Sequence, residues 1–208
     1  MSKENPIEAN KKVLILLGVL MLILIFVLVY LSIPKSSDGK VVNVGIGVNP
    51  AKGNLNSSVT IIEFGDFKCS ACKAAHPIIE NILNKYDIVL YYRNFPLPMH
   101  GEISFLSSEA AECANEQGRF WEYHDILFEN QDSLDKESLR KYAKDIGLNE
   151  EEFNSCLDNE EYKEIVLADL NEAKKLGLKG TPTFFINGKE VFGGNKEEIE
   201  KIIEEELR

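Results

Sequence analysis

The sequence has no cluster of basic residues. Of its 208 residues, 23 are Lys or Arg and 34 are Asp or Glu, which gives a formal net charge of -11. Because a phosphate backbone is held by clustered Lys and Arg, this absence argues against nucleic acid as a partner. The acidic surplus is concentrated late in the chain and is interpreted as solvated helix faces.

The sequence also lacks the usual pattern of a zinc site. It has one CxxC pair, Cys69 and Cys72, and the remaining cysteines, Cys113 and Cys156, do not form a second one. The three histidines show no ligand spacing such as H-x3-H. We therefore predict no metal ion and interpret His76, four residues after Cys72, as an ordinary, partly exposed side chain.

Charge is absent from one long stretch near the start, residues 13–33 (VLILLGVLMLILIFVLVYLSI). A helix of that length rises about 30 Å, enough to cross the apolar core of a bilayer. The stretch is followed neither by a small-residue cleavage site nor by a cysteine that could carry a lipid, so an uncleaved signal anchor is favoured over a signal peptide.

The lysines beside this stretch set the expected orientation. Lys11 and Lys12 precede it, whereas Lys35 and Lys40 follow, which is a thin positive-inside bias. The tail, residues 1–12, is therefore predicted to be cytoplasmic. The rest of the protein is predicted to be anchored in the cell membrane and to face the outside, where disulfides persist.

The rest of the chain is predicted to be a linker and one domain. Residues 34–54 are interpreted as a linker, in which 41–48 could add a short edge strand. We expect a strand, a helix that begins at the cysteines, and a parallel strand. A helical block over about 101–176, a hairpin turning at Asn187-Gly188 and a last helix complete an α/β domain, residues 55–208.

The stretch FGDFKCSACKAAHP contains the candidate reactive pair. Cys69 is expected at the N-terminus of the helix, where unpaired N–H groups and the helix dipole stabilise a thiolate and lower its pKa. Cys72, one turn further, is expected on the buried side. Such a pair can exchange disulfides with a substrate, although a CxxC alone could also be half of a metal site or a buried structural bridge.

Three further residues favour the redox interpretation. Glu63 lies in the strand six residues before Cys69, where alternation points it inward, so that it could pass protons to and from Cys72. Pro77 lies within the expected helix. Pro182, after Thr181, opens a later strand, a position at which proline can be cis.

Glu63, Cys69, Cys72, Pro77 and Pro182 together resemble the thioredoxin superfamily. The helical block resembles that of the DsbA-like branch, and AAECANEQGRFWEYHDILFENQ and GTPTFFINGK look like its membrane-anchored members. The resemblance covers about residues 55–208. It implies a thioredoxin-like fold with an inserted helical block, here preceded by a single transmembrane helix.

The resemblance also implies roles for the site residues. Cys69 would be the nucleophile, Cys72 the resolving cysteine and Glu63 the proton carrier, with Thr181 and Pro182 forming an edge that binds an extended substrate segment. No cofactor is required, because the disulfide itself carries the electrons. The dipeptide between the cysteines is Ser-Ala rather than the Pro-His of typical DsbA oxidants, so the potential could lie anywhere from about -270 to -120 mV.

Some members of this branch carry a second, structural disulfide in the helical block. The resemblance therefore implies a Cys113–Cys156 bridge, 43 residues apart, which would stabilise the fold by about 4 kcal/mol in the chain-entropy picture. Two free buried thiols, or a second redox pair that passes electrons to Cys69, are the alternatives.

The resulting hypothesis is a membrane-tethered oxidoreductase that introduces disulfides into unfolded or partly folded exported proteins. A quinone-linked membrane protein would reoxidise it. The protein is expected to be a monomer, because no dimerisation segment like that of the superfamily's isomerases is visible. One alternative is a reductase or isomerase that keeps exported thiols reduced, and another is a non-catalytic chaperone or binding module.

Overall fold

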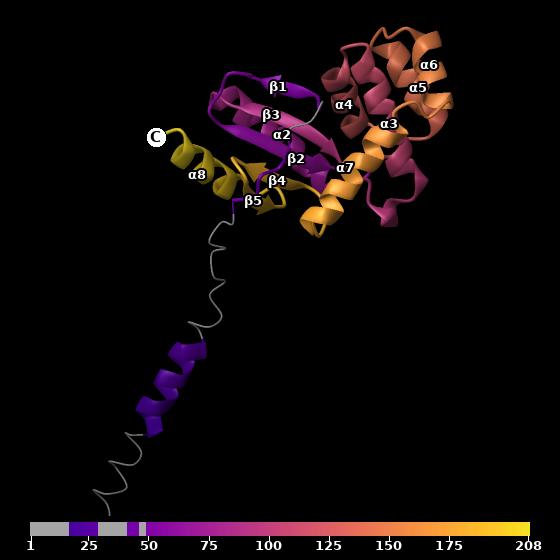
Figure 1. Ribbon diagram of the computed structural model, residues 1–208. Coiled ribbons are helices and arrows are strands. Elements are labelled where there is room, and N and C mark those ends of the chain that lie inside the picture. Colours follow the sequence, from indigo (N-terminus) through magenta and orange to yellow (C-terminus); the bar gives the residue numbers. More distant parts are fainter. Residues whose placement is uncertain (1–16, 29–40, 46–48) are drawn as a thin grey trace, which may run out of the picture. The chain divides into compact units, whose positions relative to one another are not determined.

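The computed structural model describes residues 17–28, 41–45 and 49–208, and the chain divides into two units, Met1–Asp38 and Gly39–Arg208 (Figure 1). In the first unit, residues 17–28 form a helix with exposed side chains. The rest of the predicted 13–33 anchor, and the predicted 1–12 tail, lie outside the described residues. Across the described part of the chain, the structure contains no helix with the length and apolarity needed to span a bilayer.

The second unit is built on a five-stranded sheet in the order β1-β3-β2-β4-β5. β3 is parallel to β2, and the remaining neighbours are antiparallel. The strands are β1 (Ala51–Gly53), β2 (Thr60–Gly65), β3 (Val89–Asn94), β4 (Thr183–Ile186) and β5 (Lys189–Phe192).

Helix α2 (Ser70–Lys85) connects the two parallel strands, as the sequence predicts. Its buried residues, Cys72, Ala75, Ile79 and Ile82, recur every three or four positions and form one apolar face. That face packs on the sheet, and each buried aliphatic side chain on it contributes about 1.5–3 kcal/mol.

Side chains along β2 alternate between two cores. Ile61 packs in the core that contains α2 and the C-terminal helix α8 (Lys196–Glu206), whereas Ile62 and Phe64 pack on the opposite face, near residues of helix α7 (Lys163–Leu176). The period-two rule for strands therefore places Glu63 on the α2 face, together with Ile61.

The predicted helical block lies between β3 and β4 and gathers at one end of the sheet (Figure 1). Its own core is rich in Ala, Phe and Leu and includes Cys69, Cys72 and Tyr92. The block consists of a 3-10 turn (Pro98–His100), α3 (Glu102–Glu116), α4 (Phe120–Glu129), α5 (Lys136–Asp145), α6 (Glu150–Asp158) and α7.

The β4–β5 hairpin turns at Asn187 and Gly188, which both have positive φ, 45° and 84°. The carbonyl oxygen of Gly188 also accepts a hydrogen bond from the N–H of Val42 at 2.8 Å, and a Cβ at Gly188 would lie 2.5 Å from the carbonyl oxygen of Val42. Glycine is therefore required by both the turn and the close approach of residues 41–45.

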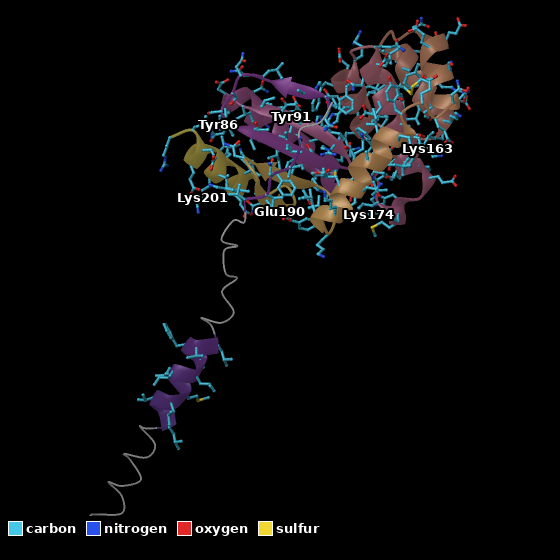
Figure 2. All side chains as sticks on the ribbon, in the orientation of Figure 1. Tyr86, Tyr91, Lys163, Lys174, Glu190 and Lys201 are labelled. Atoms are coloured by element: carbon cyan, nitrogen blue, oxygen red, sulfur yellow. A yellow bond between two sulfur atoms is a disulfide. The ribbon has the colours of Figure 1, made fainter. Side chains whose placement is uncertain are left out.

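Residues 41–45 are not a strand, although the sequence could have placed one over 41–48; residues 46–48 lie outside the described ranges. The edge strand is β1 instead, which lies within the predicted 34–54 linker and pairs with β3. The exposed charged side chains of Lys163, Lys174, Glu190 and Lys201 lie on the surface of the domain (Figure 2).

Candidate functional site

Cys69 is the N-cap residue of α2, and its backbone is extended (φ -79°, ψ 119°). The backbone N–H groups of Ala71 and Cys72 stabilise its sulfur. Both Cys69 and Cys72 are free thiols and both are buried, so the structure is that of the reduced pair. The two cysteines occupy the positions predicted from the sequence, with Cys72 fully buried on the inner face of the helix.

The two sulfurs have pKa values shifted in opposite directions. A hydrogen bond from the Cys72 thiol is the largest cause that lowers the pKa of Cys69 to about 5, and the Ala71 and Cys72 amides add to it. Burial is the main reason why the pKa of Cys72 lies well above its usual value. Near neutral pH, Cys69 is therefore a thiolate and Cys72 a thiol, which is the arrangement needed for a nucleophile and a resolving partner.

Glu63 lies in β2, on the face that α2 covers, and is only 4% exposed. Burial, with a smaller contribution from the charge of Glu80, raises the pKa of its carboxyl group to about 8. The negative charge of its carboxylate also raises the pKa of the Cys72 thiol. A carboxyl group with a pKa near neutrality, electrostatically coupled to the buried thiol, is suited to proton transfer.

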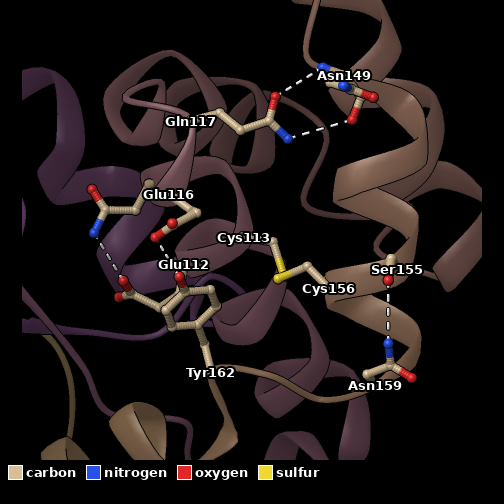
Figure 3. Close-up of a disulfide and its surroundings, with 10 residues drawn as sticks. Glu112, Cys113, Glu116, Gln117, Asn149, Ser155, Cys156, Asn159 and Tyr162 are labelled. Carbon is tan, nitrogen blue, oxygen red and sulfur yellow. Dashed lines mark hydrogen bonds between the residues drawn. A yellow bond between two sulfur atoms is a disulfide. The ribbon is translucent and has the colours of Figure 1, made fainter.

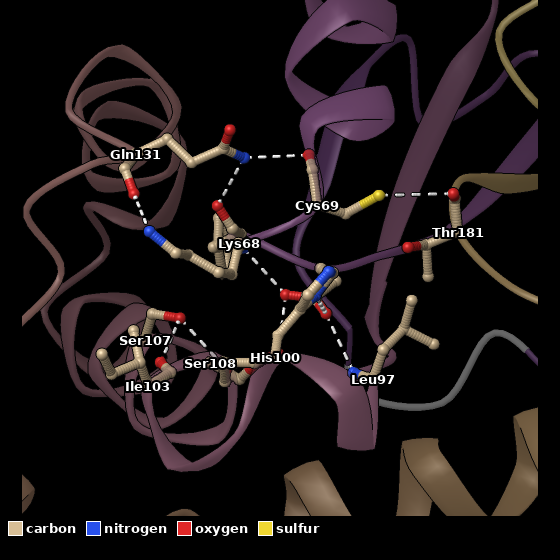
Figure 4. Close-up of polar contacts among 12 residues, drawn as sticks. Lys68, Cys69, Leu97, His100, Ile103, Ser107, Ser108, Gln131 and Thr181 are labelled. Carbon is tan, nitrogen blue, oxygen red and sulfur yellow. Dashed lines mark hydrogen bonds and ion pairs between the residues drawn. The ribbon is translucent and has the colours of Figure 1, made fainter.

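Thr181 and Pro182 face the cysteines from the loop before β4, and the peptide bond between them is cis. The Cys69 thiol donates to the carbonyl oxygen of Thr181 at 3.4 Å (Figure 4). The Thr181 side chain lies close enough to the Cys69 sulfur to help lower its pKa. The predicted substrate edge and the reactive sulfur are thus in direct contact.

Asp66, fully buried, holds the loop between β2 and Cys69, a role that the sequence analysis missed (Figure 4). Its carboxylate accepts hydrogen bonds from the backbone N–H groups of Lys68 and Leu97 and from the Ser104 hydroxyl, and it pairs with His100 at 2.7 Å. Its backbone carbonyl accepts the N–H of Cys69. Asp66 therefore fixes the position of Cys69 without touching the sulfur.

Gln131 connects the helical block to the same loop, and it too was not identified from the sequence (Figure 4). Its side-chain amide donates to the carbonyl oxygens of Phe67 and Cys69, each at 2.8 Å, while its backbone carbonyl accepts from Lys68 Nζ at 2.9 Å. The only sequence signal for Asp66 and Gln131 is their polarity, because the contacts that join the reactive loop to the helical block are between residues 31 to 64 positions apart.

Cys113 in α3 and Cys156 in α6 form a disulfide, the pairing that the sequence resemblance implied (Figure 3). Beside it, the Gln117 side chain bonds the backbone of Asn149, and Tyr162 donates to Glu116. The disulfide joins two helices of the block, and both its sulfurs belong to the block's own core.

Solved structures of DsbA-like proteins match this fold. BdbD from Bacillus subtilis, in its oxidised form, is 29% identical with a TM-score of 0.71, covering 82% of this chain and 98% of that one. The thiol-disulfide exchange protein α-DsbA2 from Wolbachia pipientis is 26% identical (TM-score 0.69; 76% and 86% covered). A thioredoxin-like oxidoreductase from Silicibacter pomeroyi is 25% identical with a TM-score of 0.69, covering 77% of this chain and 92% of that one.

The fold and site therefore define a DsbA-like thiol–disulfide oxidoreductase. A family model described as thioredoxin matches residues 47–205, and the chain belongs to this thioredoxin family.

Curated relatives match over the same domain. The Na(+)/H(+) antiporter NhaA 3 of Salinispora tropica is 34% identical over 163 residues, which are 76% of this chain and 25% of that protein. The antiporter NhaA of Herminiimonas arsenicoxydans is 35% identical over 148 residues, 70% of this chain and 23% of that protein. The chain thus spans about a quarter of the length of the curated relatives it matches.

Proposed function

We propose that the protein is a membrane-tethered oxidase that introduces disulfides into unfolded or partly folded exported proteins. The observation that carries this proposal is the Cys69 sulfur, whose pKa is lowered to about 5 by the Cys72 thiol and the amides at the start of α2. A stabilised thiolate favours the reduced form of the pair, so the oxidised form gives its disulfide away readily.

The proposed cycle is balanced in electrons and protons. A substrate thiolate attacks the Cys69 sulfur of the Cys69–Cys72 disulfide, and Cys72 leaves as a thiolate that takes a proton from Glu63. A second substrate thiolate then attacks the substrate sulfur of the mixed disulfide, and Cys69 leaves as a stable thiolate. Two electrons pass from the substrate to the enzyme, and Thr181 and Pro182 hold the substrate segment beside Cys69.

The direction of electron flow is tested by the reduction potential of the Cys69–Cys72 pair. The full chain in detergent micelles is equilibrated with glutathione buffers, and free thiols are counted by mass, which also reports on Cys113 and Cys156. We expect a potential of about -120 to -180 mV. A potential near -270 mV would contradict the oxidase and favour the reductase. A Cys69→Ser variant that retained full function in cells would favour the non-catalytic binding module.

The proposed location rests on the uncharged run over 13–33, within which residues 17–28 are helical with exposed apolar side chains. We propose that this segment anchors the protein in the cell membrane as a monomer, with its catalytic domain outside the cytoplasm. A quinone-linked membrane protein would then accept the electrons. Protease added to intact cells should digest the domain and spare the N-terminal tail, and full protection of the domain would contradict this orientation.

A further inference from the structure

Two histidines and an aspartate meet where the helix of the reactive cysteines contacts the helical block. His76 comes from α2, and His124 and Asp125 come from α4; we call these three residues the His–Asp cluster. Oδ1 of Asp125 lies 2.9 Å from Nδ1 of His124 and 3.5 Å from Nε2 of His76. One potential ligand atom from each residue lies within 4.8 Å of the other two.

The surroundings of His124 leave one of its nitrogens without a partner. Without a cation, Nδ1 must carry the proton in order to donate to the Asp125 carboxylate, and the lone pair of a neutral ring is then on Nε2. Nε2 is buried and has no hydrogen-bond partner in the part of the chain that the structure describes. A buried acceptor without a donor is costly, so the cluster is incomplete as a purely hydrogen-bonded group.

The aromatic rings around His124 are compatible with the opposite tautomer. Its centroid lies between 4.9 and 5.9 Å from the centroids of five aromatic rings, whose faces carry partial negative charge and tolerate an N–H better than a lone pair. With the proton on Nε2, the Nδ1 lone pair would face the carboxylate oxygen across 2.9 Å. Two acceptors at that distance repel each other unless a proton or a metal ion lies between them. The five rings belong to Phe67, Tyr92, Phe120, Trp121 and Phe128.

We propose that His76, His124 and Asp125 bind one divalent transition-metal ion, with Zn²⁺ as the best fit. Two imidazoles and one carboxylate are a ligand set that zinc uses, with a fourth position left for water. Tetrahedral zinc places its ligand atoms about 3.3 Å apart, and the two measured distances lie on either side of that value. The side chains of His76 and Asp125 are 20% and 39% exposed, which gives an ion access.

The charge balance around the cluster allows a cation. The positive charge of the Lys52 ammonium lowers the pKa of both His124 and Asp125, and it would repel a metal ion. The ammonium is, however, paired with Glu80 at 2.8 Å. A bound ion would join α2 to α4 one turn after Cys72. The sequence analysis predicted no metal because the two histidines lie far apart in the chain and are brought together only by the fold.

The test is calorimetric titration of the untagged full chain, in detergent micelles, with Zn²⁺ alone. The reactive cysteines are first oxidised, because their thiolates would otherwise bind the metal themselves. We expect one equivalent to bind with micromolar or tighter affinity, and we expect His76→Gln and Asp125→Asn to weaken binding at least tenfold. Asp132→Asn, a matched change at an exposed position outside the cluster, should bind as the parent does.

Two further measurements do not depend on the folding of any variant. Zn²⁺ should raise the melting temperature of the parent by several degrees, because it binds only the folded state. Co²⁺ should give the parent an absorption spectrum of a low-coordinate site with nitrogen and oxygen ligands. The proposal is overturned if the parent binds no stoichiometric Zn²⁺, or if His76→Gln and Asp125→Asn bind it as tightly as the parent.

Discussion

The buried carboxyl group of Glu63 makes the stability of the protein depend on pH. Burial raises its pKa from 4.5 to about 8, so the folded state keeps this group protonated where the unfolded chain ionises it. The stability of the parent is unaffected by this group below about pH 4.5 and declines as the pH rises toward 8, because the unfolded state loses its proton first.

We therefore expect Glu63→Gln, which cannot ionise, to gain stability relative to the parent as the pH rises. The difference in unfolding free energy should grow between about pH 4.5 and 8 and reach roughly 5 kcal/mol at its plateau. Denaturant unfolding of the oxidised proteins, in which the thiols do not titrate, measures it. A difference that did not change with pH would show that Glu63 is ionised in the folded protein.

At the scale of elements, the helical block and the reactive loop depend on each other through Gln131. We expect Gln131→Leu to remove the side-chain donor from the buried carbonyls of Phe67 and Cys69, the second of which keeps only the N–H of Lys73, and to lower the unfolding free energy by about 1–3 kcal/mol. The less firmly held loop should also raise the pKa of Cys69, because the amides at the start of α2 are then less well aligned with its sulfur.

Ultraviolet absorbance of the thiolate, followed against pH, measures the pKa of Cys69 in this variant. Asp132→Asn, at the neighbouring exposed position, is the control and should leave the unfolding free energy and the pKa of Cys69 unchanged. If Gln131→Leu lost stability but kept the Cys69 pKa of the parent, Gln131 would hold the block in place without tuning the sulfur.

The elements were also the part of the fold that the sequence predicted best. Residues 60–65, 70–85 and 183–192 carry local signals: a β-branched run, an apolar face with helical spacing, and an Asn-Gly turn. β1 has no such signal, because its three residues become a strand only by pairing with β3.

The site residues likewise fall into those that local spacing predicts and those that depend on long-range contacts. Cys69, Cys72 and Glu63 are related by short spacings along one strand and one helix, so the sequence was enough to place them. Asp66 and Gln131 join the reactive loop to segments that are distant in the chain, and local periodicity carries no information about such contacts.

For the whole molecule, the low pKa of Cys69 links the redox state to folding. The unfolded thiol has a pKa of about 9, so the stabilised thiolate contributes to the reduced folded state fully above that pH, and the contribution is lost as the pH falls through 5. Cys72 acts in the opposite sense above pH 9, where burial keeps it protonated while the unfolded thiol ionises. The reduced form should therefore have its greatest relative stability near pH 9.

We expect the unfolding free energy of the reduced full chain at about pH 7 to exceed that of the oxidised chain by about 1–3 kcal/mol, after allowance for solvent screening at the sulfur. Denaturant unfolding of both forms at about pH 5, 7 and 9 measures the difference, with Cys113–Cys156 shown by mass to be intact in each. By the thermodynamic cycle, the same difference makes the folded disulfide more oxidising than the unfolded one. A more stable oxidised form at all three pH values would mean that folding protects the disulfide, which would contradict the proposed oxidase.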